Sequence, residues 1–191
     1  VGDERAATEA ALAQALAADV AVVCGGVSVG EHDHVRAALA ALGADQVFWG
    51  VALRPGKPTW FGVGPERTGA GAAEGSGSGP PLVFGLPGNP VSAMVTFHAF
   101  ARPAIRRMLG ARDERRSATA VFDKPYAKRP GRAHLVRCRL ELLDDGWHAR
   151  PTGPQGSHVL TSMLGADALA ILPTDRGDVA AGERVEIELL D

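Results

Sequence analysis

The chain has 191 residues, 46% of them hydrophobic and 22% charged, with a formal net charge of −2 at pH 7. These proportions are typical of a soluble globular protein with one large domain or two smaller ones. The low net charge argues against a general nucleic-acid-binding protein, because affinity for phosphate backbones comes from accumulated Lys and Arg. No apolar run reaches the roughly 20 residues needed to span a bilayer, and the first residues lack the pattern of a signal peptide. We therefore expect a cytoplasmic protein with no membrane or nucleic-acid partner.

The first half of the chain alternates helical patterns with short apolar runs. Helices are predicted at 3–16 and 35–42, and strands at 20–24, 46–53, 59–63 and 82–86. Residues 64–81 are rich in Gly, Ser, Ala and Pro, so we expect a mobile loop there. Asn89 and Pro90 then open a long helix to about residue 109, with Asn89 as its N-cap and a kink at Pro103.

The pattern changes after Gly110. Short alternating runs between about residues 118 and 189 are separated by turn signals such as Asp145-Gly146, which predicts a small β barrel or sandwich. The expected fold is therefore a partial three-layer α/β domain with a mainly parallel sheet over 1–112, followed by a barrel-like all-β domain over 113–191. Because the α/β part begins with a helix, we expect it to lack its first βαβ portion.

Two glycine-rich loops each follow an apolar strand and precede a helix. GGVSVGEHD spans 25–33, and Glu31-His32 stands where a phosphate-binding P-loop needs Lys and Ser or Thr, which excludes a nucleotide site of that type. In LPGNPVS, residues 86–92, the backbone N–H groups of the first helical turn can bind an anion. Taken alone, the first loop could equally be a tight structural turn, and the second would be interpreted as an ordinary well-capped helix.

A third loop, RPGKP at residues 54–58, lies between two predicted strands. Pro55 and Gly56 force a turn, so Arg54 and Lys57 can project together toward a phosphate or another oxyanion. The alternative is a hairpin tip with solvated charges. The three loops together predict one electropositive, glycine-lined crevice for a phosphorylated or oxyanionic ligand.

These motifs, in this order, resemble the molybdopterin molybdenumtransferases, a family that includes the animal protein gephyrin. GGVSVGEHD, RPGKP and GLPGNPVSAMVTF are similar to the family's third domain, and GPQGSH and LPTDRGDVAAGE to its β-rich fourth domain. The resemblance implies insertion of molybdate into adenylated molybdopterin with release of AMP, assisted by Mg²⁺ or another divalent cation. It also implies a homodimer in the full-length protein.

Carried over by position, the resemblance implies roles for particular residues. Asp33 and Lys57 are the candidate catalytic residues, and Asp33 is also the candidate metal ligand. Arg54 stands where the family usually has Lys. The candidate substrate-binding residues are Gly25, Gly26, Ser28, Gly30, Arg54, Gly56, Pro87, Gly88, Asn89, Pro90, Ser92, Arg137 and Ser157.

Two departures and two alternatives qualify this reading. The family's N-terminal domains and its acidic TGDE-type loop are not in this sequence, so we expect this segment alone to have little or no transferase activity. A molybdopterin adenylyltransferase is one alternative, although those enzymes typically have LPGSP and lack the β-rich tail. A gephyrin-like scaffolding or binding module is the other.

Overall fold

The computed structural model describes residues 4–28, 34–67, 79–111 and 116–190. Contacts divide the chain into two units. The first, here called the sheet unit, comprises Val1–Val51 and Pro58–Gly88; the second, the barrel unit, comprises Ala52–Lys57 and Asn89–Asp191. No helix in the described part is both long and apolar enough to cross a membrane.

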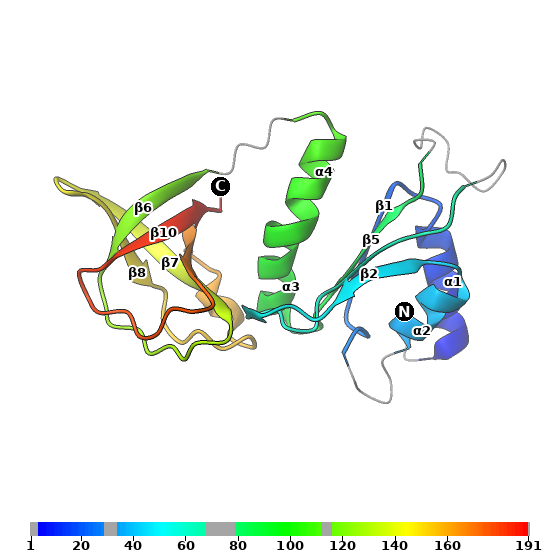
Figure 1. Ribbon diagram of the computed structural model, residues 1–191, viewed down its shortest axis with the longest axis horizontal. Helices are drawn as coiled ribbons and strands as arrows, with labels where there is room; N and C mark the ends of the chain where they lie inside the picture. The colour runs from blue at the N-terminus through cyan, green and yellow to red at the C-terminus, as the bar shows by residue number, and fades with distance from the viewer. Residues whose placement is uncertain (1–3, 29–33, 68–78, 112–115, 191) are drawn as a thin grey trace. The chain divides into compact units, whose positions relative to one another are not determined.

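The sheet unit consists of a four-stranded sheet with two helices on one face (Figure 1). The strand order is β1-β5-β4-β2, formed by Val20–Cys24, Leu82–Leu86, Trp60–Val63 and Asp45–Trp49. The helices α1 (Arg5–Ala15) and α2 (Val35–Ala41) bury Leu12 and Leu39 against Ala21, Trp60 and Val83 of the sheet. Burying this apolar stripe is the main source of stability for such short helices.

The sheet is mixed rather than mainly parallel. β1 pairs with β5 in parallel, but β4 pairs antiparallel with both β5 and β2. The prediction of a mainly parallel three-layer domain is therefore not confirmed. The prediction came from apolar runs, and those of β1 and β5 do belong to a parallel pair. An apolar run indicates burial but not strand direction, so the antiparallel course of β4 could not be predicted from it.

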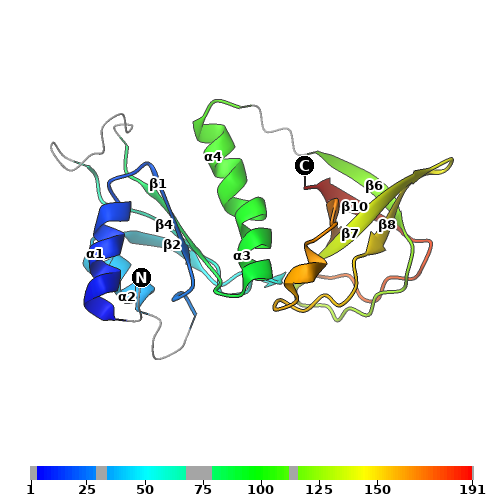
Figure 2. The ribbon, with the colours of Figure 1, turned by 180° about the vertical axis from the view of Figure 1, so that it is seen from behind.

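The barrel unit contains a closed five-stranded barrel, which confirms the expected barrel-like fold. The strands are β6 (Ser117–Phe122), β7 (Ala133–Leu143), β8 (Gly146–Pro151), β9 (Ala168–Leu172) and β10 (Arg184–Leu189). They are paired in the order β7-β8-β6-β10-β9, and a β7–β9 pairing closes the circle (Figure 2). Closure leaves no free edge along the ring. A short strand, β3 (Leu53–Arg54), is added in parallel to the beginning of β7.

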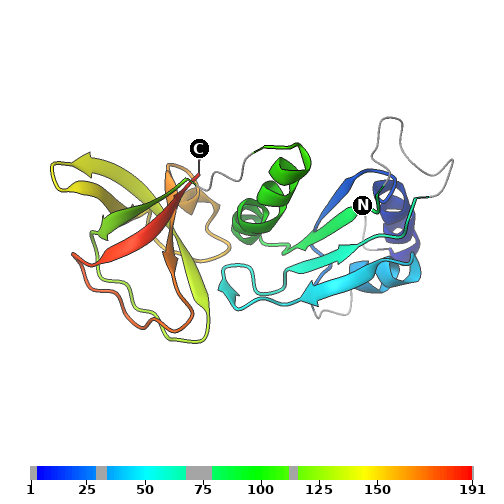
Figure 3. The same ribbon diagram turned by 45° about the horizontal axis from the view of Figure 1, so that its top comes forward.

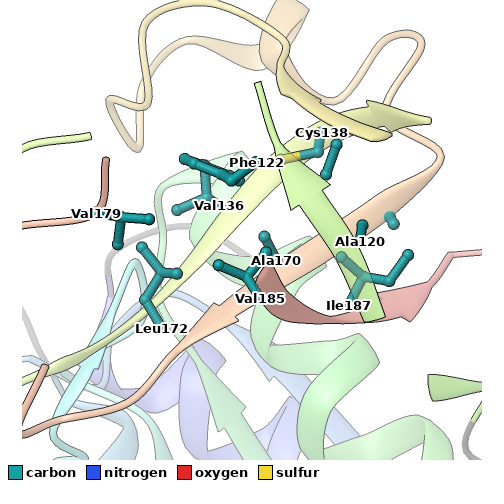
Figure 4. Packing of buried hydrophobic residues seen from close by; sticks show 11 residues of the cluster. Ala120, Phe122, Val136, Cys138, Ala170, Leu172, Val179, Val185 and Ile187 are labelled. Atoms are coloured by element: carbon teal, nitrogen blue, oxygen red, sulfur yellow. The ribbon is translucent and has the colours of Figure 1, made fainter. Parts of the chain in front are cut away.

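Small and branched side chains fill the barrel interior. Phe122, Val136, Leu172 and Ile187 are each buried, and they pack with the alanines of β6, β8 and β9 (Figure 4). Cys138 lies in the same core, where burial raises the pKa of its thiol to about 12. The thiol is therefore protonated and serves as a small apolar side chain.

A long helix precedes the barrel in the chain. It runs through α3 (Pro90–Thr96), a π-helical turn (Phe97–Ala101), α4 (Arg102–Met108), and appears as one continuous rod (Figure 3). The π turn comes directly before Pro103, whose missing N–H and ring disfavour a regular α-helical turn. His98 of this helix lies 3.3 Å from a carboxylate oxygen of Glu188 in β10. A short 3₁₀ turn, Leu160–Ser162, follows β8.

Candidate functional site

The two glycine-rich loops meet at the carboxyl ends of β1 and β5. The Gly25 N–H donates to the Leu86 carbonyl at 2.9 Å, which continues the parallel pairing by one residue. A Cβ atom on Gly88 would lie 3.5 Å from the Cα of Gly25, so the two backbones pass in close contact. Gly25 and Gly26 have φ values of 89° and 67°, which L-residues rarely adopt. The structure thus brings Gly25, Gly26, Pro87 and Gly88 together within the sheet unit.

The other predicted residues of the first loop are Ser28, Gly30 and Asp33. Ser28 is exposed. Gly30 and Asp33 lie outside the described residues, so their predicted roles stay predictions. Among the described residues, no group of three or more His, Cys, Asp or Glu side chains is placed to hold a metal ion.

The first four residues of the RPGKP loop, 54–57, belong to the barrel unit and are not a simple hairpin tip. Its strand β3 pairs with Ala133 and His134 of β7, and the Ala133 N–H donates to the Ala52 carbonyl at 2.8 Å. Pro55 and Gly56 are buried, Gly56 has a φ of 120°, and the peptide bond before Pro55 is cis. The flanking Arg54 and Lys57 are exposed. A buried Pro-Gly turn therefore presents two cations to solvent.

Arg137, on β7, is a fully buried cation. Only 1% of its surface is exposed. Its Nε donates to Ser162 Oγ at 3.1 Å and one terminal nitrogen donates to the Gly156 carbonyl at 3.4 Å. In the described part of the chain it forms no ion pair with a carboxylate. Burial, with a further contribution from Arg54, lowers its pKa below the ordinary value for arginine.

The loop that carries Ser157 is held against Arg137. Gln155 accepts the Arg137 N–H at 2.9 Å and donates back to the Arg137 carbonyl at 3.2 Å. Thr152 closes the loop with a hydroxyl bond to the Ser162 carbonyl at 2.7 Å. Ser157 is therefore positioned by a network of hydrogen bonds centred on Arg137.

Asn89 contacts this loop instead of capping its own helix. It occupies the N-cap position and Pro90 follows at the first helical position, as predicted, but the Asn89 side chain makes no capping hydrogen bond. Its Nδ2 instead donates to Ser157 Oγ at 3.2 Å. The prediction that its side chain caps the helix is therefore wrong, because the side chain is hydrogen-bonded to Ser157 instead. Ser92 is 4% exposed and lies inside the helix packing rather than on an open loop.

Sequence reasoning missed a cluster of basic residues beside Arg54. Lys128, Arg129, Arg132 and His134 line a pocket of about 740 Å³ with Arg54 and Asp178. Burial, followed by the charges of Arg54, Lys128 and Arg132, lowers the pKa of His134 to about 4. The available signal was the run KRPGRAH, in which three cations flank a Pro-Gly turn.

Two families of known proteins match the two parts of the chain. Residues 1–107 match the family described as "Probable molybdopterin binding domain", and residues 119–190 match "MoeA C-terminal region (domain IV)". The first match covers more than half of the chain. The protein is therefore of the class in which a molybdopterin-binding α/β segment is followed by a MoeA-type β domain.

Individual relatives agree with this class. The molybdopterin molybdenumtransferases of Haemophilus influenzae and Bacillus subtilis are 33% and 32% identical, over 90% and 100% of this chain. The crystal structure titled molybdopterin biosynthesis moea protein from Pyrococcus horikosii covers 99% of the chain with a TM-score of 0.76 and 27% identity. The chain belongs to the molybdopterin molybdenumtransferase family, and the resemblance seen in its motifs is confirmed. It spans about two fifths of these relatives: 39%, 41% and 42% of their respective lengths.

Proposed function

We propose that this chain supplies the oxyanion-binding part of a molybdopterin molybdenumtransferase, which inserts molybdate into adenylated molybdopterin and releases AMP. The buried guanidinium of Arg137 is the observation that carries the proposal. A buried charge without a counter-charge is costly, and an anionic ligand would offset that cost. Arg137 is surrounded by neutral hydrogen-bonding groups among the described residues, so a dianion is the partner that its site lacks.

The proposed site within the barrel unit combines this buried cation with groups held around it. Ser157 and Asn89 form a hydrogen-bonded pair beside it, and Ser157 can donate to an oxyanion while its own oxygen accepts from Asn89. The positive charge of Arg54 contributes to lowering the Arg137 pKa. Lys57, Gly56 and the rest of the turn supply a second cation and backbone groups from the same loop.

The proposed chemistry is electrostatic. Cleavage of the adenylate leaves negative charge on phosphate oxygens, and Arg, Lys and hydroxyl groups fixed in advance stabilise that charge without a protein nucleophile. Mg²⁺ with Asp33 as a ligand is part of the family's expected chemistry. The described residues offer no cluster of metal ligands, so the steps assigned here use only this chain's cations and hydrogen-bond donors.

Other expectations remain part of this proposal. We propose homodimerisation and a cytoplasmic location for the full-length protein.

We also propose two domains, at 1–112 and 113–191, and the ends of the two family matches at 107 and 119 support this division. The match over 119–190 favours a molybdenumtransferase over an adenylyltransferase, because the β-rich tail is what the adenylyltransferases lack. Ser28, Gly30, Pro90 and Ser92, and the glycine pair at 25 and 26, stay predicted substrate contacts.

Molybdate titration of the chain and of its Ser157→Ala and Lys57→Ala variants tests the proposal. Each substitution removes a polar group from a half-exposed or exposed position, so folding should be preserved. We expect each to weaken molybdate binding by about 1–3 kcal/mol, which is the usual scale for a charge-assisted hydrogen bond. Isothermal titration calorimetry gives the dissociation constants directly.

Arg139→Ala provides the matched control. Arg139 lies on the same strand two residues beyond Arg137, is exposed, and donates to the Gly165 carbonyl rather than toward Ser157. Its loss should leave molybdate affinity unchanged. Equal affinities for the parent chain, Ser157→Ala and Lys57→Ala would refute the proposed oxyanion site.

A further inference from the structure

The basic pocket beside Arg54 is bounded by segments that are tied together. The Lys128 side chain is 3% exposed, and its Nζ donates to the carbonyls of Arg176 at 2.6 Å and Thr174 at 3.4 Å. The Lys128 N–H also donates to Asp178 Oδ1 at 2.7 Å, and the Gly131 N–H donates to the Thr174 carbonyl at 2.8 Å. The turn at 127–132 and the loop at 174–178 therefore form one preorganised frame around the pocket.

The pocket has more positive than negative charge. Arg54, Lys128, Arg129 and Arg132 line it, and Asp178 is its one acidic lining residue. Asp178 already accepts a backbone hydrogen bond from Lys128. The three arginines form no ion pair with any carboxylate of the described residues.

His134 lines the same pocket as these cations. It is 5% exposed, and its Nδ1 lies 3.2 Å from the Tyr126 hydroxyl. Arg54, Lys128 and Arg132 all act to keep its ring neutral. The same three cations line the pocket, so a polyanion bound there would meet several positive charges at once.

Size distinguishes between kinds of anion. A cavity of about 740 Å³ is within the range of small-molecule sites and is far larger than a single tetrahedral oxyanion requires. Pro130 and Ala127 add apolar surface to the lining. The forked guanidinium groups suit phosphate oxygens, which they can bind in pairs.

We propose that this pocket binds the diphosphate group of a phosphorylated small organic molecule, through Arg129, Arg132, Lys128 and Arg54. The inference deepens the proposed function and rests on it through Arg54. This residue lines the pocket, and its charge also helps to lower the pKa of Arg137 in the proposed oxyanion site.

Pyrophosphate is the probe for the first experiment. We expect it to bind the chain at constant ionic strength, and to bind at least about tenfold more weakly to the Arg129→Gln/Arg132→Gln double variant, since each guanidinium supplies charge-assisted bonds. Both residues are exposed, so their replacement should not disturb folding. Arg150→Gln is the control, because Arg150 is exposed on β8 and contacts Asp123 instead; its affinity should stay within about twofold.

A second measurement locates the bound probe. Following the His134 ring by NMR during a pH titration, we expect saturating pyrophosphate to raise its pKa, because the anion offsets the nearby cations. An unchanged His134 titration, or an equal loss of affinity in the double variant and the Arg150→Gln control, would overturn the proposal. Orthophosphate binding as tightly as pyrophosphate would also overturn it, because the site would then recognise a single oxyanion.

Ser157→Ala separates this inference from the proposed function. It should weaken molybdate binding and leave pyrophosphate binding intact. If molybdate binding responds to Ser157→Ala while pyrophosphate fails to bind, the diphosphate pocket is wrong and the oxyanion site stands. If pyrophosphate binds as expected and molybdate does not bind, the proposed function fails and the pocket remains.

Discussion

At the scale of single residues, His134 shows how burial and surrounding charge control protonation. Burial is the largest cause of its low pKa, followed by repulsion from Arg54, Lys128 and Arg132. Its folded-state pKa, about 4, lies below the ordinary histidine value of 6.5, so protonation favours the unfolded chain. The stability linked to this histidine is therefore complete above pH 6.5 and is lost as the pH falls toward 4.

We expect His134→Asn to reduce the pH dependence of stability over this window. The wild-type chain should lose unfolding free energy between pH 7 and pH 4.5 partly because His134 must become protonated on unfolding. The variant lacks this titration, so its loss should be smaller, as measured by urea denaturation at a series of pH values. Parallel profiles for the two proteins would contradict the assignment.

His148 on β8 should show the opposite behaviour. Its Nδ1 lies 2.7 Å from Asp123 Oδ1 and its Nε2 lies 2.9 Å from Asp145 Oδ1. Because both partners accept hydrogen bonds, the doubly protonated ring fits best, and the bond to Asp123, then that to Asp145, raises the His148 pKa. Its stabilising contribution is complete below the ordinary histidine pKa and is lost as pH rises through the raised value.

His148→Gln should therefore destabilise the barrel more at pH 6 than at pH 9. At pH 6 the wild-type ring is charged and bonded to both carboxylates, whereas at pH 9 most of that advantage is absent. Melting temperatures of the two proteins at the two pH values measure the difference. A gap between the two melting temperatures that is equal at pH 6 and pH 9 would show that the ring acts only through packing.

At the scale of elements, sequence patterns predicted the bounds of strands and helices well where the segment is strongly apolar or its signals are local. The strands at 20–24 and 82–86 have the predicted bounds, and the long helix after Asn89 was expected. The predicted strand at 46–53 was only partly right, because β2 ends at Trp49 and Gly50 adopts a φ of 81°. Leu53–Arg54 pairs instead with β7, about 80 residues away, and short sequence patterns carry no information about such a distant partner.

The candidate site was predictable to a similar degree. The motifs identified Arg54, Asn89, Arg137 and Ser157, and the structure brings Asn89, Ser157 and the segment around Arg137 together by hydrogen bonds. The burial of Arg137 could not be predicted, because a charged residue in an alternating strand ordinarily faces solvent. The pocket frame was also missed, since it depends on Lys128 reaching carbonyl groups almost 50 residues further along the chain.

The central strand β4 contains a glycine whose lack of a side chain is required by packing. A Cβ atom on Gly62 would contact the Trp60 ring and lie 2.5 Å from the Asp45 carbonyl oxygen. Trp60 cannot yield easily, because it is 2% exposed and its Nε1 donates to Gln46 Oε1 at 2.8 Å. Gly62 thus leaves room for the Trp60 ring and for the Asp45 carbonyl of the neighbouring strand β2.

Gly62→Ala should lower the free energy of unfolding by about 1–3 kcal/mol, the usual cost of overpacking. Gly79→Ala is the control, because a Cβ atom there would meet no atom within 4 Å. Chemical denaturation of both variants gives the comparison. Similar stabilities for the two alanine variants would show that the sheet relaxes around the added methyl group.

At the scale of the whole molecule, the two units are not consecutive halves of the sequence. Residues 52–57 leave the sheet unit to join the barrel unit, and the chain then returns to complete the sheet with β4 and β5. The RPGKP loop therefore belongs structurally with Arg137 and Ser157, although it lies between two strands of the other unit in the sequence. Its residues can share a site with the barrel because β3 is part of the barrel's sheet.

The segment expected to be a mobile loop, 64–81, is anchored at its described ends. The Arg67 side chain donates to the Asp19 carboxylate at 2.7 Å, to the Ala17 carbonyl at 3.1 Å and to the Gly79 carbonyl at 2.7 Å. Its side chain is 6% exposed. Arg67 thus joins the two described ends of the segment to each other and to the turn before β1. The expected mobility of residues 64–81 stays a prediction.

Two changes should consequently have very different effects on stability. Replacing residues 68–78 by a short Gly/Ser linker keeps Arg67 and Gly79, and because closure entropy varies slowly with loop length, the melting temperature should change little. Arg67→Ala leaves the loop length unchanged but removes an ion pair and several hydrogen bonds at a buried side chain, so it should cost about 1–3 kcal/mol. Thermal denaturation of both proteins shows whether the stabilising contacts lie at Arg67 or within residues 68–78. A large drop in melting temperature on replacing 68–78, together with an unchanged melting temperature for Arg67→Ala, would place those contacts within 68–78.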